Sequence, residues 1–270
     1  MMPRRLENWL INAVLYGSMV GILIVFFLPI FTLIAFSFNT GAYLIFPFEG
    51  FGFQWYKELF AHLDTVDAFI NSLIVAVVVT LVATTLGTAA ALAWVRYKFR
   101  LKRAYQALNI LPLIFPQFLL GVIMLLWFSV LGNWFDFSPS LVTVVVGHVV
   151  YITPFAMIVV AVQIHAFDDT LEDAARDLGA KGWTVFKEIT LPLLWPGIFS
   201  AAIFVFLLSW GNFYITYNLN GGYRTVPTFV FAGLAMGGLP IYPTVATLVF
   251  IPGLILVAVA EHFRRRAMAR

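Results

Sequence analysis

The most constraining feature of this sequence is a long N-terminal segment without charged side chains. No Asp, Glu, Lys or Arg occurs between Glu7 and Glu49, and residues 10–38 are almost all apolar. A helix needs about 20 apolar residues to cross a bilayer core about 30 Å thick. The apolar region of a cleaved signal peptide is shorter, about 7–15 residues. Residues 10–38 therefore predict a transmembrane helix.

Five further apolar runs follow along the chain. With the first, they cover residues 10–38, 68–95, 107–131, 141–167, 193–217 and 241–260. The runs are continuous, whereas strands of a membrane β-barrel alternate over about ten residues. Hydrophobic residues make up 62% of the chain and charged residues 11%, against about 45–50% and about 25% in soluble domains. The sequence thus predicts an all-α membrane protein with six transmembrane helices in a single domain, residues 1–270.

The basic residues predict the orientation of these spans. Six spans place both termini on one side of the membrane, and every Lys and Arg except Lys57 and Arg224 then falls on that side. Basic residues concentrate in cytoplasmic loops, so we expect both termini in the cytoplasm. The net charge of +3 then reflects topology, and no nucleic-acid partner is expected. The cluster Arg264, Arg265 and Arg266 is expected to contact anionic membrane lipid.

The predicted spans lack the side chains that usually carry ion coupling or catalysis. The acidic and basic residues can all be placed in loops or at helix ends, and the chain has no cysteine. Intramembrane charges usually mark ion or proton pathways, so their absence argues against ion-gradient-driven transport. The sequence also has no phosphate-binding loop, nucleophile elbow or zinc-protease motif. We therefore expect no catalytic residue, no metal and no cofactor in this chain.

One histidine, His148, falls deep within a predicted span. We interpret it as a hydrogen-bonded packing residue, because polar side chains inside helix bundles bond to neighbouring helices. A proton relay is the alternative interpretation.

The loop between the fourth and fifth predicted spans, residues 168–192, is unusually acidic. It holds six of the 13 acidic residues, although it lies on the basic side of the protein. Asp169 or Thr170 is suited to cap a short helix, because Glu or Asp follows three residues later. Gly179 suits the left-handed residue that ends such a helix. A second short amphipathic segment, residues 183–189, is expected to end at the proline before the fifth span.

Composition leaves two interpretations of this loop open. It can lie in the membrane interface as an amphipathic segment, or it can project as a docking surface for a cytoplasmic partner. Small residues favour docking, because they let another surface approach closely. They are Ala174, Ala175, Gly179 and Ala180.

The spacing within this loop resembles a family pattern. The order Asp-Ala-Ala at 173–175, then Gly179, then Ile-x-Leu-Pro at 189–192 is similar to the Glu-Ala-Ala loop of binding-protein-dependent ABC importer permeases. The difference is Asp173, where the family usually has Glu. The resemblance covers about residues 10–265. The residues that it assigns to ATPase coupling are Glu172, Asp173, Ala174, Ala175, Gly179, Ala180, Ile189, Leu191 and Pro192.

This resemblance implies a multi-pass subunit of the bacterial inner (plasma) membrane with the type I ABC importer transmembrane fold. It implies a second permease subunit, expected to be a different chain, two ATP-binding cassette subunits, and a periplasmic or lipid-anchored solute-binding protein. ATP and Mg are expected on the ATPase partner, so this chain would have no enzymatic activity of its own. Residues 168–192 would form the coupling helices that fit into the ATPase.

The solute is less constrained than the family. Chain length and the pattern from Trp55-Tyr56 to Ser72 look closer to polyamine-type permeases, so a polyamine or a related organic cation is expected. Many polyamine-type members carry two aspartates in the fifth span, and here Gly211-Asn212 replaces them. Importers of the same family for sugars, phosphonates, opines or iron complexes are alternatives. An ion-gradient-driven secondary transporter or a membrane scaffold is an alternative of another class.

Polar and aromatic residues around the end of the fifth predicted span are candidates for the translocation pathway. Their hydrogen-bonding groups and ring faces suit an organic cation. An aromatic belt at the membrane interface is the alternative interpretation. The candidates are Trp210, Asn212, Tyr214, Thr216, Tyr217 and Asn218.

Overall fold

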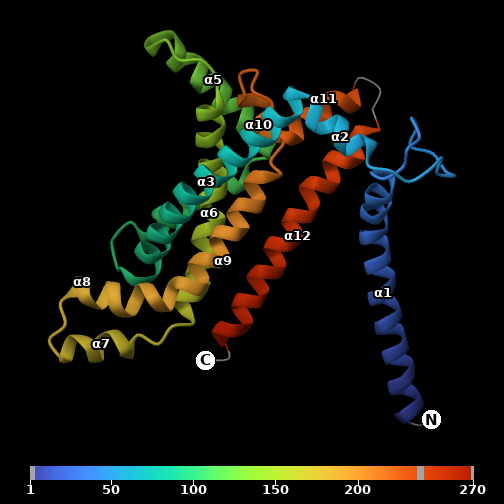
Figure 1. Cartoon of the computed structure of the whole chain (residues 1–270). Helices are drawn as coiled ribbons and strands as arrows, with labels where there is room; N and C mark the ends of the chain where they lie inside the picture. The colour runs from blue at the N-terminus through green and yellow to red at the C-terminus, as the bar shows by residue number, and fades with distance from the viewer. Residues whose placement is uncertain (1–3, 236–239, 269–270) are drawn as a thin grey trace. The chain divides into compact units, whose positions relative to one another are not determined.

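The computed structural model describes the backbone of residues 4–235 and 240–268 and the side chains of residues 9–235 and 240–259. Over this part of the chain the protein is all-α, and its one β-type contact is an isolated bridge between Asn39 and Phe51. The elements, most of them labelled in Figure 1, are α1 (Arg4–Phe36), α2 (Gln54–Ala61), α3 (Leu63–Arg96), α4 (Lys102–Ile114), α5 (Gln117–Phe135), α6 (Leu141–His165), α7 (Thr170–Asp177), α8 (Gly182–Val185), the π-turn η1 (Phe186–Thr190), α9 (Leu191–Trp210), α10 (Tyr214–Leu219), α11 (Val226–Ala235) and α12 (Ile241–Met268).

Six helical segments within the described residues are long and apolar enough to cross a membrane. They are Trp9–Phe36, Leu63–Arg96, Gln117–Phe135, Leu141–His165, Gly182–Trp210 and Ile241–Val259. The prediction of an all-α membrane protein with six spans is confirmed. The side chains of Arg264, Arg265 and Arg266, for which lipid contact is expected, lie outside the described residues.

The third predicted span, residues 107–131, is wrong as a single helix. Phe115 has an extended ψ of 135°, which separates α4 from α5. Pro116 explains this break, because a proline lacks an N–H and disfavours the helical conformation of the residue before it. The spanning segment is therefore α5, which begins at Gln117.

The fifth predicted span, residues 193–217, is wrong in the same way. Helix α9 ends at Trp210, and α10 begins at Tyr214. Between them, the side-chain oxygen of Asn212 accepts a hydrogen bond from the N–H of Ile215 at 3.2 Å. A side-chain oxygen that satisfies a free N–H at a helix N-terminus favours the start of a new helix. The polar end of this predicted span is therefore a break followed by a short helix.

Pro192 does not end the segment that precedes α9, contrary to the prediction from sequence. It lies in the first turn of α9, where its missing N–H is tolerated. Just before it, the N–H of Leu191 donates to the carbonyl of Phe186, which is the wide turn of a π-helix. In a regular α-turn the proline ring would clash with the carbonyl four residues earlier, and the wider turn relieves this clash. Residues 182–210 thus form one helical segment.

Contacts within the chain group the described residues into two compact units. One unit comprises residues 4–62 with 233–235 and 240–251, and the other comprises 63–232 with 252–268. Helices α1 and α2 lie in the first unit, and α3 to α10 lie in the second. Both candidate sites described below lie in the second unit.

The first unit fixes α2 to the end of α1 by hydrogen bonds. The indole N–H of Trp55 donates to the carbonyl of Asn39 at 2.7 Å. The hydroxyls of Ser37 and Tyr56 lie 2.9 Å apart and form a second hydrogen bond. These two bonds hold the first residues of the connecting segment against α2.

The core of the second unit lies where α3, α6 and α9 pack against one another (Figure 1). Small residues allow a close approach, since a Cβ added to Gly87 on α3 would lie 2.5 Å from the Cβ of Ala156 on α6. Helix α10 packs against α5 and α6 at one end of this unit, and α7 and α8 project from the other end. Fully buried side chains of this core include Val79, Ile152, Met157, Val205 and Ile215.

Candidate functional site

The loop from residue 168 to residue 192 begins with an acid that caps α7. The carboxylate of Asp168 accepts a hydrogen bond from the N–H of Thr170 at 3.0 Å. This bond lowers the pKa of the Asp168 carboxyl from its ordinary value, because it stabilises the charged form. Asp169 occupies the N-cap position, but its side chain makes no capping bond. The prediction of Asp169 at the N-cap position is confirmed, but the side chain that bonds to the first turn is that of Asp168.

Helix α7 ends at the glycine that the sequence predicts. Gly179 has a φ of 87°, in the left-handed region that favours glycine. Its N–H donates to the carbonyl of Arg176 at 2.9 Å, and the N–H of Ala180 donates to the carbonyl of Ala175 at 3.0 Å. These two bonds form a Schellman motif, which satisfies the last carbonyls of a helix. The prediction of a left-handed Gly179 is confirmed.

Glu172, rather than Asp173, is the acid that fixes α7 to its surroundings. The side chain of Glu172 is 10% exposed, whereas that of Asp173 is 70% exposed. The Thr190 hydroxyl donates to Glu172 at 2.7 Å. The guanidinium groups of Arg176 and Arg96 donate to the same carboxylate at 3.3 and 3.4 Å. Asp173 pairs with Arg176 at 2.8 Å on the exposed side of the same helix.

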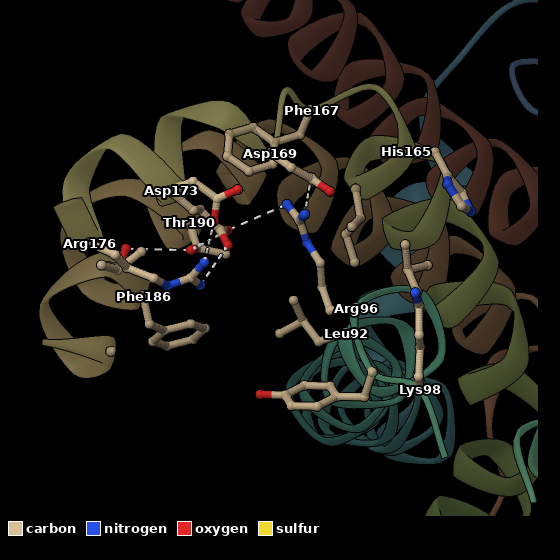
Figure 2. A pocket seen from close by; sticks show the side chains of 16 residues that line it. Leu92, Arg96, Lys98, His165, Phe167, Asp169, Asp173, Arg176, Phe186 and Thr190 are labelled. Carbon is tan, nitrogen blue, oxygen red and sulfur yellow. Dashed lines mark hydrogen bonds and ion pairs between the residues drawn. The ribbon is translucent and has the colours of Figure 1, made fainter. Parts of the chain in front are cut away.

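Arg96, the last residue of α3, extends to the beginning of α7. It pairs with Asp169 as well as with Glu172, and its guanidinium lies 4.9 Å from the ring centroid of Phe167. Figure 2 shows Arg96 pointing toward Asp169, with Lys98 lying apart from the ion pairs. These groups line a cavity of about 710 Å³. The charged groups on its wall thus include carboxylates and guanidinium groups that pair with one another.

The outer face of the loop presents small and apolar side chains. Ala174 and Gly179 are exposed, and a Cβ added to Gly179 would have no neighbour within 4 Å. Leu178 is 89% exposed and Trp183 is 72% exposed. Exposed apolar groups of this kind, beside small residues, are typical of interaction surfaces. One side of the loop is therefore held by ion pairs with α3, and the other side is exposed.

The remaining residues of the predicted coupling set lie at the two bends of the loop. Ala175 and Ala180 flank the Schellman turn and are half-buried. Ile189 and Leu191 are half-buried, and Pro192 is exposed, at the junction of η1 with α9. The structure thus brings the whole predicted set onto α7, the turn after it, and this junction.

A second polar site lies inside the bundle, around His148 on α6. The Nδ1 and Nε2 atoms of His148 lie 2.9 Å from the hydroxyl oxygens of Ser209 and Thr216, respectively. Thr216 donates its hydroxyl hydrogen to the carbonyl of Asn212 at 2.9 Å, so it accepts a hydrogen bond from Nε2. Nδ1 then accepts the hydroxyl hydrogen of Ser209. The prediction that His148 is hydrogen-bonded is confirmed, and its role in packing stays a prediction.

The predicted pathway residues differ in exposure. Asn212 and Thr216 are buried in the His148 network, where they hold α10 in place. Trp210 is half-buried and stacks on Phe206 with ring centroids 5.9 Å apart. Asn218 donates from its side chain to a carbonyl of its own helix at 2.8 Å. These four residues therefore make contacts within the chain.

The two tyrosines of the set belong to an aromatic cluster with an open face. Tyr214 and Tyr217 are 52% and 50% exposed. The ring of Phe213 lies 5.4 Å from that of Tyr214, 5.3 Å from that of Tyr217, and 4.7 Å from that of Phe231. Phe231 is itself 48% exposed. Exposed ring faces in a cluster are suited to bind an organic cation.

Sequence reasoning missed several site residues, among them Arg96 and Thr190, which reach Glu172 from other parts of the chain. Arg96 lies 76 positions from Glu172, and Thr190 lies 18 positions from it. No helical spacing links residues so far apart. The available signal for Arg96 was a basic residue at the end of a span, which the topology of the membrane already explained.

Comparison with known proteins places this chain among transport proteins. A family model described as binding-protein-dependent transport system inner membrane component matches residues 83–268. The putrescine transport system permease protein PotI of Escherichia coli strain K12 is 32% identical over 253 residues, which are 90% of each chain. The spermidine/putrescine transport system permease protein PotC of Haemophilus influenzae is 28% identical over 241 residues, covering 89% of this chain and 92% of the relative.

Solved structures with a similar fold include chains of two ABC transporters. A bacterial transporter that imports the acidic polysaccharide alginate matches with a TM-score of 0.76 at 18% identity, over 96% of both chains. The methionine transporter MetNI in an inward-facing conformation matches with a TM-score of 0.64 at 18% identity, over 74% of this chain and 94% of the other. These similarities show the fold alone.

Proposed function

Because this chain belongs to the family of binding-protein-dependent transport system inner membrane components, which are permease subunits of ABC importers, we propose that it forms half of an ATP-driven import pathway. It is an inner-membrane component with six spans. In this proposal, residues 1–270 form one permease domain, and the other half of the pathway is a second permease subunit of different sequence. A periplasmic or lipid-anchored binding protein delivers the solute.

The proposed coupling element is the loop of residues 168–192. Both termini and this loop lie in the cytoplasm, in agreement with the distribution of basic residues. The observation that carries the proposal is the contrast within α7. Its Glu172 is held by the protein, while its Ala174 and the following Gly179 are exposed. Such a surface admits the close approach of a cytoplasmic ATPase subunit.

Two such ATPase subunits, one beneath each permease, bind ATP with Mg and hydrolyse it. ATP shifts the permease between inward- and outward-facing states only if the ATPase contacts these states differently. The loop transmits that difference, because its π-turn continues directly into the spanning helix α9. A movement of α7 and α8 therefore displaces a membrane helix.

The proposed solute is a polyamine or a related organic cation. Two polyamine permeases are similar to this chain over about nine-tenths of its length. Tyr214, Tyr217 and Phe231 are about half exposed, and their rings are proposed to make cation–π contacts with an ammonium group. Thr216 attaches α10 to His148 and is itself bonded to the carbonyl of Asn212. Trp210 and Asn218 are proposed as further residues of the pathway.

Reconstitution into proteoliposomes tests this function. The chain, its partner permease, the ATPase and the binding protein are combined, and uptake of labelled putrescine is measured with and without internal ATP. We expect uptake to require ATP and every component, and to be competed by spermidine but not by maltose or phosphonates. Uptake driven by a proton or sodium gradient without ATP would contradict the proposal.

A further inference from the structure

The strongest unassigned feature of the second unit is the charged contact between the end of α3 and the start of α7. Arg96 is in neither the predicted coupling set nor the predicted pathway. Its side chain is 16% exposed and it pairs with two carboxylates, those of Asp169 and Glu172. It also lies over the ring of Phe167. An arginine held on several sides at once has a fixed orientation.

Arg96 differs from Arg176, which also pairs with Glu172, because Arg96 connects two different helices. Arg176 lies on α7 itself and is 52% exposed, so its pairs with Glu172 and Asp173 stay within one helix. Among the ion pairs of the described residues, those of Arg96 join the 168–192 loop to another helix. Exposed pairs within a helix contribute little, whereas charge-assisted bonds to a nearly buried carboxylate are stronger.

One oxygen of Glu172 connects three helical elements. Its Oε1 accepts hydrogen bonds from Arg96 on α3 and from Thr190 in η1. Because η1 continues into α9 and α3 packs against α9, the carboxylate links α7 to two packed helices of the bundle. The contacts of Glu172 with α3 and η1 therefore set the direction in which α7 presents its outer face.

We propose that Arg96 is a positioning residue for energy coupling, which fixes the docking helix α7 to the spanning helix α3. The proposal rests on the coupling function proposed above. Arg96 acts through Asp169 and Glu172, and does not itself touch ATP or the solute. Without it, α7 keeps its own fold through Asp168 and Gly179 but loses its fixed orientation relative to α3. ATP is then still hydrolysed, but fewer solute molecules are transported per ATP.

An engineered cross-link tests this role directly, because the chain has no cysteine of its own. The double variant Arg96→Cys/Asp169→Cys is reconstituted with all partner subunits, and the number of solute molecules transported per ATP hydrolysed is measured. We expect this ratio to fall at least tenfold in the reduced protein. A short bis-methanethiosulfonate cross-linker should restore at least half of the wild-type ratio, and a reducing agent should abolish the recovery.

Two outcomes would overturn the proposal. One is a wild-type ratio in the reduced double variant, and the other is no recovery after complete cross-linking. Asp169→Cys alone serves as the matched control and should transport within threefold of wild type, because Arg96 keeps its pair with the nearly buried Glu172. If the cysteine pair fails to insert, Arg96→Lys and Arg96→Gln carry the test, since the lysine keeps one charge and should preserve coupling at least threefold better.

The same measurements separate this proposal from the one on which it rests. Wild-type protein that shows no ATP-dependent uptake contradicts the importer function itself. ATP-dependent uptake by the wild type together with a wild-type ratio in Arg96→Gln contradicts only the positioning role of Arg96.

Discussion

Thr190 donates its hydroxyl hydrogen to Oε1 of Glu172 at 2.7 Å, and both residues are buried. Thr190 is the last residue of the π-turn that leads into α9, and Glu172 lies in the first turn of α7. This bond therefore joins the exposed helix of the loop to a spanning helix. It gives the acidic loop a defined attachment to the bundle.

Glu172 and Asp173 form a matched pair that tests this attachment. Glu172→Gln removes the charge that Arg96, Arg176 and Thr190 share, and we expect it to cost about 1.5–3 kcal/mol of stability. Transport should fall at least fivefold. Asp173→Asn changes a 70% exposed group, and its effect should stay within about 1 kcal/mol. Thermal unfolding in detergent measures stability, and ATP-dependent uptake measures transport. Equal effects of the two substitutions would show that Glu172 does not hold α7 more strongly than Asp173 does.

Gly179 separates backbone strain from docking. Gly179→Ala places a Cβ in the left-handed region and should cost about 1–2 kcal/mol of stability. Asn tolerates that region, so Gly179→Asn should fold like wild type but place a side chain on the proposed docking surface. We expect Gly179→Asn to lower stimulated ATPase activity and uptake at least tenfold.

Gly182 provides the control for this comparison. It is also exposed and a Cβ added there would meet no neighbour within 4 Å, but it has no positive φ. Gly182→Ala should transport within twofold of wild type. Wild-type uptake by Gly179→Asn would show that the exposed turn is not a docking surface.

Asp168 gives the start of α7 a dependence on pH. Its folded pKa is lowered by the N–H of Thr170, so the charged form stabilises the helix above the ordinary carboxyl pKa. This stabilisation is lost as the pH falls through the lowered value. Asp168→Asn keeps an acceptor for the N–H and should remove the acid sensitivity, whereas Asp168→Ala should loosen α7 at every pH. Hydrogen exchange of the α7 amides, followed from pH 7 to below the ordinary carboxyl pKa, checks both expectations. Identical exchange in the two variants would argue against the cap.

The membrane helices were predictable because apolar length is a local property of sequence. The two wrong spans have local causes as well. Pro116 and Asn212 each interrupt an apolar run. The average hydropathy of each run stays high despite the interruption, so the sequence predicts one continuous helix where the structure has two. Proline alone is an ambiguous signal, since Pro192 lies within the continuous helical segment of residues 182–210, whereas Pro116 coincides with the break between α4 and α5.

The candidate site was predictable only in part for a different reason. Gly179 could be assigned because a left-handed residue after a short helix is a local requirement. The choice of Glu172 over Asp173 depends on which face of α7 meets α3 and η1, and that is decided by packing. Arg96 reaches this carboxylate from 76 positions away, where the spacing of a single sequence carries no information.

His148 offers a final test, because Gln can replace both of its hydrogen bonds and Phe can replace neither. Its ring nitrogens bond to Ser209 and Thr216 at 2.9 Å each, and a bond between membrane helices contributes about 0.6–2 kcal/mol. His148→Phe should therefore lower the thermal unfolding midpoint and raise the KM for the solute, as α10 loses its attachment to α6. His148→Gln should restore most of both properties. Both ring nitrogens of His148 bond to hydroxyls, which suits a structural role. The pH profile of uptake should therefore be the same in wild type and His148→Gln. A profile that changes would instead support a proton relay.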